Sequence, residues 1–434
     1  MGLSKKDLDI DHINSDELTQ VDFANWESDD IFEVAEYFNA YLADADKKKY
    51  MVYGQPLMTS PTPEFEVYDR YAGKIRKFLN FCSYNYLGYS FHPEVIKAVQ
   101  AALGKYGTGA VSAPLLSGVY DVTKHLEEEI SCFKKQEAAI VFPTGYSSNL
   151  GVISGLLRPG DAAVLDILSH ASIYDGVRLS GADIKVFPHN NPRGLEKTLK
   201  KLKTKRILVC LEGVYSMDGD LANLPELIPI CKKYGARILL DEAHSSLIFG
   251  ETGAGVAEHF GMEDEIDIAI GTFSKAFGAI GGFAAGESKI LTYLRMYARS
   301  YVFSCAVAPH TAAGILKVLE LYKQDKSPRD KLWENTHYTW EKLRKAGLDI
   351  GETKSQVIPV MAGNDLRLRE ISKRIMQKGL YTGVVTYPAV SKNKTRLRLS
   401  VSSAHSKEQI DRAVAILKEV YDEMKHFNKD KISP

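Results

Sequence analysis

Short apolar runs alternate with helical patterns from about residue 78 to 290, and this alternation constrains the fold more than any other feature. The runs occupy residues 138–142, 162–165, 207–211, 238–240, 266–270 and 283–285. Most of them lack strict alternation of apolar and polar residues, which is typical of strands buried on both faces of a parallel sheet. Between them lie helical patterns such as residues 90–107, where Ile96, Val99 and Leu103 share one face. The pattern predicts an α/β fold with a large, doubly wound and mostly parallel sheet.

The chain changes character after about residue 310. Amphipathic helices are expected near residues 310–322 and 331–346, followed by short strands near 356–361 and 395–402. A last helix over residues 406–427 begins with a capping box formed by Ser406 and Gln409. We therefore predict three parts in the 434 residues: an N-terminal arm with an acidic segment (1–78), a large α/β domain (79–310) and a smaller C-terminal α+β domain (311–434).

Composition excludes several classes of protein. The chain has 55 Lys and Arg residues against 55 Asp and Glu residues, so it lacks the basic excess of a dedicated nucleic-acid binder. No apolar stretch approaches the roughly 18 residues of a membrane span, and the polar N-terminus has no apolar signal-peptide core. The five cysteines form no CxxC pair, which argues against a disulfide framework and a cysteine zinc site. We expect a cytoplasmic enzyme without a metal.

The N-terminal segment is strongly acidic. Residues 1–46 hold thirteen acidic residues and two basic ones, Lys5 and Lys6, together with several aromatic residues. We expect this segment to be a charged arm that packs on the body of the protein. A docking or lid element is the alternative.

The string Asp241-Glu242-Ala243-His244 directly follows one of the apolar runs. Carboxylates at a strand end could hold Mg²⁺ in a nucleotide hydrolase, but the chain has neither the GxxxxGK[ST] phosphate loop nor a GxGxxG fingerprint. The other interpretation is an acid that binds a protonated ring nitrogen at the carboxyl edge of the sheet. Lys275, in the string Gly271-Thr272-Phe273-Ser274-Lys275, follows another run and is a candidate for Schiff-base formation.

These parts suit pyridoxal 5′-phosphate. This cofactor needs a lysine for its aldehyde, an acid for its pyridine nitrogen, a group to stack on its ring, and hydroxyl and N–H groups for its phosphate. Thr144, Gly145 and Tyr146 lie between a run and a helical pattern, where backbone N–H groups can bind phosphate. His170 follows the run at 162–165 and is a further candidate at a strand end.

The chain resembles the α-oxoamine synthase family of pyridoxal-phosphate enzymes. The matching strings occur in the family's order: 85–88 (NYLG), 106–109 (YGTG), 144–151 (TGYSSNLG), 170–180 (HASIYDGVRLS), 212–220 (EGVYSMDGD), 241–244 (DEAH), 271–275 (GTFSK) and 396–405 (RLRLSVSSAH). The resemblance implies the fold-type I transferase fold, which is aspartate aminotransferase-like. It also implies a homodimer with active sites at the interface, and a decarboxylative condensation of a small amino acid with an acyl thioester.

The resemblance also implies residue roles. Lys275 would hold the cofactor and move protons, Asp241 would pair with the pyridine nitrogen, and His170 would stack on the ring. The other cofactor contacts would be Gly145, Tyr146, Ser216, His244 and Thr272, with Ser304 and Cys305 reaching the phosphate in the partner chain. The substrate contacts would be Asn85 and Arg398, with Arg398 binding the carboxylate of the amino acid.

Some positions depart from the family's pattern. Ser112-Ala113-Pro114 follows the YGTG string where relatives often carry an arginine, and Thr386 stands where oxononanoate synthases usually carry one. Serine with a long acyl chain, as in serine palmitoyltransferase, is the first expectation, with alanine or glycine and either coenzyme A or an acyl carrier protein left open. The alternatives are another pyridoxal-phosphate reaction, such as transamination or that of 2-amino-3-ketobutyrate ligase, and a catalytically inactive partner subunit.

Overall fold

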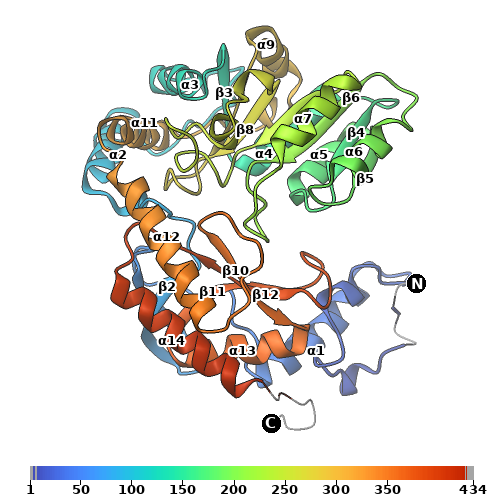
Figure 1. Ribbon diagram of the computed structural model, residues 1–434, viewed down its shortest axis with the longest axis vertical. Coiled ribbons are helices and arrows are strands. Elements are labelled where there is room, and N and C mark those ends of the chain that lie inside the picture. The colour runs from blue at the N-terminus through green and yellow to red at the C-terminus, as the bar shows by residue number, and fades with distance from the viewer. Residues whose placement is uncertain (1–2, 5–6, 426, 428–434) are drawn as a thin grey trace. The chain divides into compact units, whose positions relative to one another are not determined.

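The computed structural model describes residues 3–4, 7–425 and 427 and divides into two compact units (Figure 1). The larger unit comprises Tyr84–Trp333 and Ser402–Ala404, and the smaller one comprises Met1–Ser83, Glu334–Val401 and His405–Pro434. Lys5 and Lys6 lie outside the described residues. The three-part division that we predict, with boundaries at residues 78 and 310, stays a prediction.

The larger unit contains a seven-stranded sheet in the order β3-β9-β8-β7-β6-β4-β5. Its strands are β3 (Ala138–Phe142), β4 (Ala162–Asp166), β5 (Asp183–Phe187), β6 (Ile207–Glu212), β7 (Arg237–Asp241), β8 (Ile268–Thr272) and β9 (Gly282–Gly286). Neighbouring strands from β8 to β5 run parallel, whereas β9 is antiparallel to both of its neighbours. The predicted mostly parallel sheet is therefore confirmed.

Each apolar run that we identified contributes to a strand, and two details differ. The strand predicted at 266–270 begins two residues later, because the Asp267 carboxylate accepts a hydrogen bond from Ile238 N (2.8 Å) and pairs with Arg237 (2.7 Å) before β8 starts. Strand β5 was missed. It lies at the edge of the sheet and is largely exposed or half-buried, so its sequence lacks the continuous apolar run of the central strands.

The larger unit also contains helices, which pack around its sheet (Figure 1). They are α2 (Pro93–Tyr106), α3 (Asp121–Phe133), α4 (Gly145–Leu156), α5 (Ala171–Ser180), α6 (Pro192–Leu199), α7 (Leu224–Lys233), α8 (Val256–His259), α9 (Ser288–Tyr297), α10 (Arg299–Val302) and α11 (Pro309–Gln324). The main core lies where α4, α5 and α9 bury apolar side chains such as Val152, Ile173 and Leu294 against the strands. Helix α12 (Ser327–Lys345) belongs to the larger unit up to Trp333 and to the smaller one from Glu334.

The smaller unit is built on a five-stranded sheet in the order β1-β2-β11-β12-β10. Its strands are β1 (Glu64–Asp69), β2 (Lys74–Phe81), β10 (Val357–Gly363), β11 (Leu380–Val385) and β12 (Thr395–Ser400). Only β2 and β11 pair in parallel. Helices α13 (Asp365–Gln377) and α14 (Lys407–Glu423) belong to this unit, and the predicted capping box of Ser406 and Gln409 begins α14.

The acidic N-terminal segment is part of the smaller unit. It forms two 3₁₀ turns (Ile10–His12 and Gln20–Phe23) and helix α1 (Glu33–Lys47). Phe23 is buried; its ring stacks on Trp26, meets Phe38 edge-on and lies tilted against Tyr41. Phe32 is exposed, so not every aromatic residue of the segment packs. The segment packs within the smaller unit.

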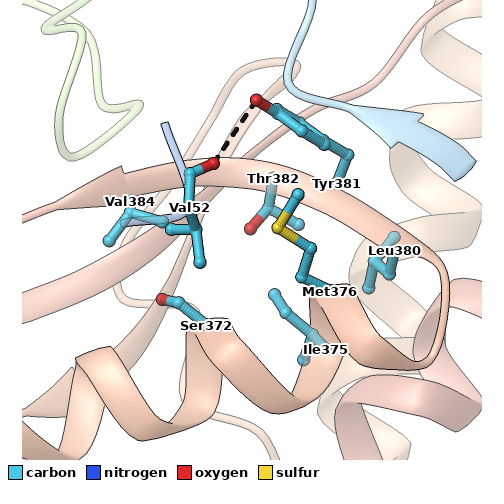
Figure 2. A pocket seen from close by; sticks show the side chains of 8 residues that line it. All are labelled: Val52, Ser372, Ile375, Met376, Leu380, Tyr381, Thr382 and Val384. Atoms are coloured by element: carbon cyan, nitrogen blue, oxygen red, sulfur yellow. Dashed lines mark hydrogen bonds between the residues drawn. The ribbon is translucent and has the colours of Figure 1, made fainter. Parts of the chain in front are cut away.

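A small pocket lies between α13 and β11 of this unit, lined by Val52, Met376, Tyr381 and their neighbours (Figure 2). Tyr381 donates a hydrogen bond of 3.4 Å to Val52 O across its rim. Its volume is about 10 Å³, which is room for one water molecule. The pocket is therefore a packing gap and cannot hold an amino acid or a cofactor.

Candidate active site

The candidate site lies at the carboxyl ends of the parallel strands in the larger unit. Asp166, Glu212, Asp241 and Thr272 are the last residues of β4, β6, β7 and β8, which are neighbours in the sheet. All four side chains are buried. Because parallel strands end at the same edge of a sheet, polar groups from four separate segments gather there, at the place where open α/β sheets bind ligands.

A hydrogen-bonded line connects Asp241 with His170. Asn149 Nδ2, from α4, donates to Asp241 Oδ2 (2.7 Å) and to Ser172 Oγ (3.0 Å). Ser172 Oγ lies 2.8 Å from His170 Nδ1, and Ser172 N donates to the same ring nitrogen at 3.3 Å. Since Nδ1 accepts the backbone N–H, the ring proton of neutral His170 belongs on Nε2. Asp241 is buried, whereas His170 is exposed, so its ring is accessible to a ligand.

Asn149 and Ser172 lie in strings that we singled out, but the sequence analysis assigned them no role. Asn149 is separated from Asp241 by 92 residues, so only the fold reveals their contact. Asp241 Oδ1 accepts a second hydrogen bond from Ala243 N (2.9 Å). Both oxygens of Asp241 are thus fixed by donors, which orients its carboxylate.

Glu212 is a third residue for which the sequence indicates no role. It lies directly opposite Asp241 in the β6–β7 register, and its Oε1 accepts a hydrogen bond of 2.5 Å from His170 N. Burial, followed by the nearby charge of Asp241, raises the pKa of Glu212 well above its usual range, while the bond from His170 and the charge of Lys275 oppose the shift. Through the bond from His170 N, Glu212 anchors the turn that carries His170.

His244 is held by two tyrosines. Its Nδ1 lies 2.9 Å from the hydroxyl of Tyr86, which is fully buried, and the ring of Tyr84 meets it edge-on with centroids 6.0 Å apart. Asn85, between these tyrosines, is buried, and its Oδ1 accepts a hydrogen bond from Ser90 N (3.3 Å). The segment 84–90 therefore places the predicted substrate residue Asn85 next to the residues that hold His244.

Lys275 lies in a tight turn that follows β8. Gly278 N donates to Lys275 O (2.9 Å), and Gly278 has a φ of +66°. A Cβ at Gly278 would approach Ser90 N to 2.4 Å, so only glycine allows the turn to pack against the 84–90 segment. Lys275 is half-buried, between the buried aromatic residues Phe273 and Phe277 in the chain. The lysine is thus held at the edge of the sheet by a rigid turn.

The start of α4 forms a cradle that fits a phosphate. Thr144 caps this 12-residue helix by accepting hydrogen bonds from Ser147 N and Ser148 N, so the N–H groups of Gly145 and Tyr146 are the ones that can bind a phosphate. A Cβ at Gly145 would lie 2.7 Å from Thr272 Cβ, so the glycine lets the end of β8 approach the helix. The neighbouring Tyr146 is exposed and donates a hydrogen bond of 2.5 Å to Asp175.

These residues fit pyridoxal phosphate by the chemistry of their donor set. The larger unit supplies a half-buried lysine, a buried and oriented carboxylate, an exposed imidazole and a helix N-terminus beside the Thr272 hydroxyl. Ser216, also predicted as a cofactor contact, is buried in the loop after β6. Among residues 3–4, 7–425 and 427, no three His, Cys, Asp or Glu side chains converge on a metal site.

Three further predicted residues belong to other segments of the chain. Ser304 is half-buried and Cys305 is exposed in the segment that follows α10. Arg398 lies in the smaller unit, on β12, with only 9% of its surface exposed. Its Nε would be 3.6 Å from a Cβ at Gly383, so a glycine on the neighbouring strand β11 leaves space for the guanidinium stem. Arg396 lies on the same face of the strand and donates to Lys394 O.

Comparisons with known proteins identify the class. The family model for aminotransferase class I and II matches residues 76–417. The chain is 37% identical over 404 residues to 4-hydroxy-2,2′-bipyrrole-5-methanol synthase PigH of Serratia sp., covering 93% of this chain and 62% of PigH. It is also 38% identical over 347 residues to the 8-amino-7-oxononanoate synthase of Thermoanaerobacter pseudethanolicus, covering 80% and 88% of the two chains.

A solved structure is similar along most of the chain. The serine palmitoyltransferase of S. paucimobilis with a bound pyridoxal phosphate–myriocin aldimine superposes with a TM-score of 0.85 at 32% identity, covering 92% of this chain and all of that one. The chain therefore belongs to the aminotransferase class I and II family. Within that family its relatives are α-oxoamine synthases, which confirms the resemblance and the fold-type I fold that the sequence predicts.

Proposed function

We propose that this chain is a pyridoxal-phosphate-dependent α-oxoamine synthase. It condenses a small amino acid with an acyl thioester of coenzyme A or an acyl carrier protein, and it yields an α-amino ketone, CO₂ and a free thiol. Serine with a long acyl chain is the first candidate pair of substrates. The observation that carries the proposal is the line from Asp241 through Asn149 and Ser172 to His170, at the same sheet edge as Lys275.

The chain's own residues divide the chemistry between them. When bound, pyridoxal phosphate supplies a sink for the electron pair left at the α-carbon of the amino acid. Lys275 holds the cofactor and then accepts and returns the α-proton. Asp241, fixed by Asn149 and Ala243, keeps a negative charge at the pyridine nitrogen. His170 would stack on the ring, and His244, which is held by Tyr86, would bind the phenolic oxygen.

The bonds balance with one proton taken from water. The α-carbon loses its proton to Lys275 and attacks the thioester carbonyl, so a C–C bond forms and the C–S bond breaks. The leaving thiolate takes up one proton, the bond to the amino acid's carboxylate breaks to release CO₂, and the α-carbon is protonated again, so that the α-proton and one proton from water supply the two that are consumed. No oxidant or reductant is needed, and one proton-transfer group near the α-carbon, Lys275, is sufficient.

Substrate binding is proposed for Arg398 and Asn85. Arg398 is buried, and the planar guanidinium can grip a carboxylate through two parallel hydrogen bonds. We assign it to the carboxylate of the amino acid. Asn85 is assigned to the same substrate because it lies in the segment that holds His244. The phosphate of the cofactor is assigned to Gly145, Tyr146, Ser216 and Thr272.

We also propose that the enzyme is a cytoplasmic homodimer in which Ser304 and Cys305 complete the partner's phosphate site. An apolar surface around these residues supports the dimer: Val111, Leu116 and Phe303 are 88%, 82% and 74% exposed. The bond from Ala306 N to Ser112 O (3.0 Å) ties the two segments that carry them. The cysteines in the described part of the chain are unpaired, as in a reducing compartment. No helix among the described residues is long and apolar enough to span a membrane.

The proposal is tested by product analysis of the purified protein. Serine, alanine and glycine are each offered with a series of acyl-coenzyme A thioesters of increasing chain length, and α-amino ketone, CO₂ and thiol are measured. Equal amounts of the three products support the condensation. Formation of a keto acid from the amino acid, without release of CO₂, would show that the protein is a transaminase. Binding of the cofactor without turnover of any substrate would favour the interpretation as a catalytically inactive partner subunit.

A further inference from the structure

His189 is a titratable residue of the larger unit that the proposed chemistry does not use. It follows β5 and lies between two carboxylates. Its Nδ1 is 2.9 Å from Asp166 Oδ1, and its Nε2 is 2.9 Å from Asp220 Oδ2. The Asp166 side chain is fully buried, and that of Asp220 is 17% exposed. The ring of Tyr215 packs edge-on against the imidazole, with centroids 4.5 Å apart.

Asn190 repeats both connections. Its backbone N–H donates to Asp166 Oδ2 (2.8 Å), and its side-chain amide donates to Asp220 Oδ2 (2.9 Å) and Leu221 O (2.7 Å). Asn190 has a φ of +51°, in the left-handed region that asparagine tolerates better than most residues. A strained conformation persists only where its surroundings fix it. The hydrogen bonds of residues 189 and 190 therefore hold this part of the backbone in one defined conformation.

The two carboxylates belong to segments that carry proposed cofactor contacts. Asp166 ends β4, and its Oδ1 also accepts from Leu168 N (2.9 Å) in the turn that leads to His170. Asp220 closes the small hairpin after β6: Tyr215 N donates to Asp220 O (3.0 Å), and Val214 pairs with Leu221. Ser216 lies within this hairpin. The pair 189–190 thus joins the turn before His170 to the hairpin around Ser216.

We propose that His189, as an imidazolium bonded to Asp166 and Asp220, is a positioning residue that sets the His170 ring and Ser216 relative to each other. When both carboxylates are ionised they can only accept, so each ring nitrogen must carry a proton, and the two contacts of 2.9 Å then describe an imidazolium. The inference rests on the proposed function for the roles of His170 and Ser216. The connection between the two segments does not depend on those roles.

The test uses the full chain and two variants of this network. His189→Gln keeps one donor but removes the charge and the second bond, and Asp220→Asn removes one carboxylate while keeping its shape. His125→Gln is the matched control, because His125 is an exposed histidine on α3 of the same unit. We expect both network variants to bind pyridoxal phosphate about tenfold more weakly, the effect of losing one charged contact. We also expect a smaller circular-dichroism band of the bound cofactor, and the control should match the wild type.

Hydrogen exchange of the cofactor-free proteins gives a second readout. The variants should exchange faster both in residues 166–170 and in residues 213–221, because the two segments lose their common tie. Faster exchange confined to residues 188–191, or unchanged cofactor affinity and circular dichroism in folded variants, would overturn the proposal. If the wild type itself binds no pyridoxal phosphate, the proposed function fails, and the exchange pattern still decides whether His189 couples the two segments. If His189→Gln does not fold, Asp220→Asn decides.

Discussion

Each unit contains a cation that ties distant segments together, and the two cations are held differently. In the larger unit His189 bonds to the carboxylates of Asp166 and Asp220. In the smaller unit Arg369, on α13, donates to the carbonyl oxygens of Ser15 and Leu18 and to the Tyr41 hydroxyl, and it pairs with Asp365. The first cation connects loops at the ends of strands, and the second connects the N-terminal segment to a helix.

The residues around the two cations indicate that each has a different role. The segments joined by His189 present polar groups, and His170, which follows the first of these segments, is exposed. The segments joined by Arg369 present aromatic side chains that pack on one another, including Phe23, Phe38 and Tyr41. We therefore expect changes around His189 to alter ligand binding and changes around Arg369 to alter stability. Five predictions test this contrast, and they run from the largest expected effect to the smallest.

If the larger unit binds the ligand and the smaller one contributes stability, the proton transfer at the α-carbon should depend on Lys275, at the sheet edge of the larger unit. Lys275→Ala should reduce turnover by at least about 10³-fold, because no other group is assigned to the α-proton. Borohydride treatment of the wild type should attach the cofactor to Lys275, as mass spectrometry of its peptides would reveal. Lys289→Ala changes an exposed lysine of the same unit and should have no effect. Near-normal turnover of the Lys275 variant would contradict the assignment.

Asp241→Asn should have the next largest effect. The amide cannot carry the negative charge that keeps the pyridine nitrogen protonated, so exchange of the amino acid's α-proton with solvent should slow by about 10²-fold. The fold should survive, since Asn149 can still bond to the amide oxygen. Asp183→Asn, at the exposed start of β5, is the control. Wild-type exchange rates in Asp241→Asn would mean that another group pairs with the ring.

Arg369→Met should act on stability instead of binding. It leaves the carboxylate of Asp365 and two backbone carbonyls without their buried partner, which should cost about 3 kcal/mol in the free energy of unfolding. Urea denaturation followed through Trp26, whose ring stacks on Phe23, reports on this part of the chain. Arg374→Met is the control on the same helix, because Arg374 is 40% exposed and should matter little. A large change in kinetic constants with unchanged stability would reverse the contrast.

The sequence predicts the strand ends of the larger unit well. The apolar runs there are short but nearly uninterrupted, and the residues that follow several of them are the ones the structure gathers at one edge. The sequence does not predict how those residues are oriented. The bonds of Asn149 to Asp241 and of Glu212 to His170 join residues that are far apart in the chain, and only the strand order brings them together.

The smaller unit is harder to predict for a related reason. Its sheet joins β2 to β11 in parallel across about 300 residues, so its N-terminal strands cannot be assigned to it from local patterns. The same holds for Arg369, whose partners Ser15, Leu18 and Tyr41 lie more than 300 residues away. Local periodicity finds elements, and it carries no information on pairing between distant ones.

Arg398 and Arg369 both belong to the smaller unit, but we assign substrate binding to Arg398 and stability to Arg369. If Arg398 binds the carboxylate of the amino acid, Arg398→Lys should raise the KM for the amino acid about tenfold and leave the KM for the thioester nearly unchanged. Arg396→Lys is the control on the same strand, since no substrate contact is assigned to it. Lower stability without a change in either KM would place Arg398 with Arg369 as a structural residue.

The contribution of His189 to stability should depend on pH, whereas that of Arg369 should not. Burial opposes the charged ring, but the bonds to Asp166 and Asp220 outweigh it and raise the pKa of His189 to about 10. The unfolded chain loses this proton near pH 6.5, so between these values the folded state holds one proton more. The stability that His189 adds is therefore complete below about pH 6.5 and is lost as the pH rises through about 10.

The stability difference between the wild type and His189→Gln should accordingly shrink with rising pH. With allowance for the partly exposed ring, we expect a change of about 0.5 kcal/mol per pH unit between pH 7 and 9.5. The difference between the wild type and Arg369→Met should stay constant over the same range, because a guanidinium does not titrate there. Urea denaturation of the three proteins at several pH values measures both differences. If the His189→Gln difference were constant, or grew with pH, the ring would not be a cation between the two carboxylates.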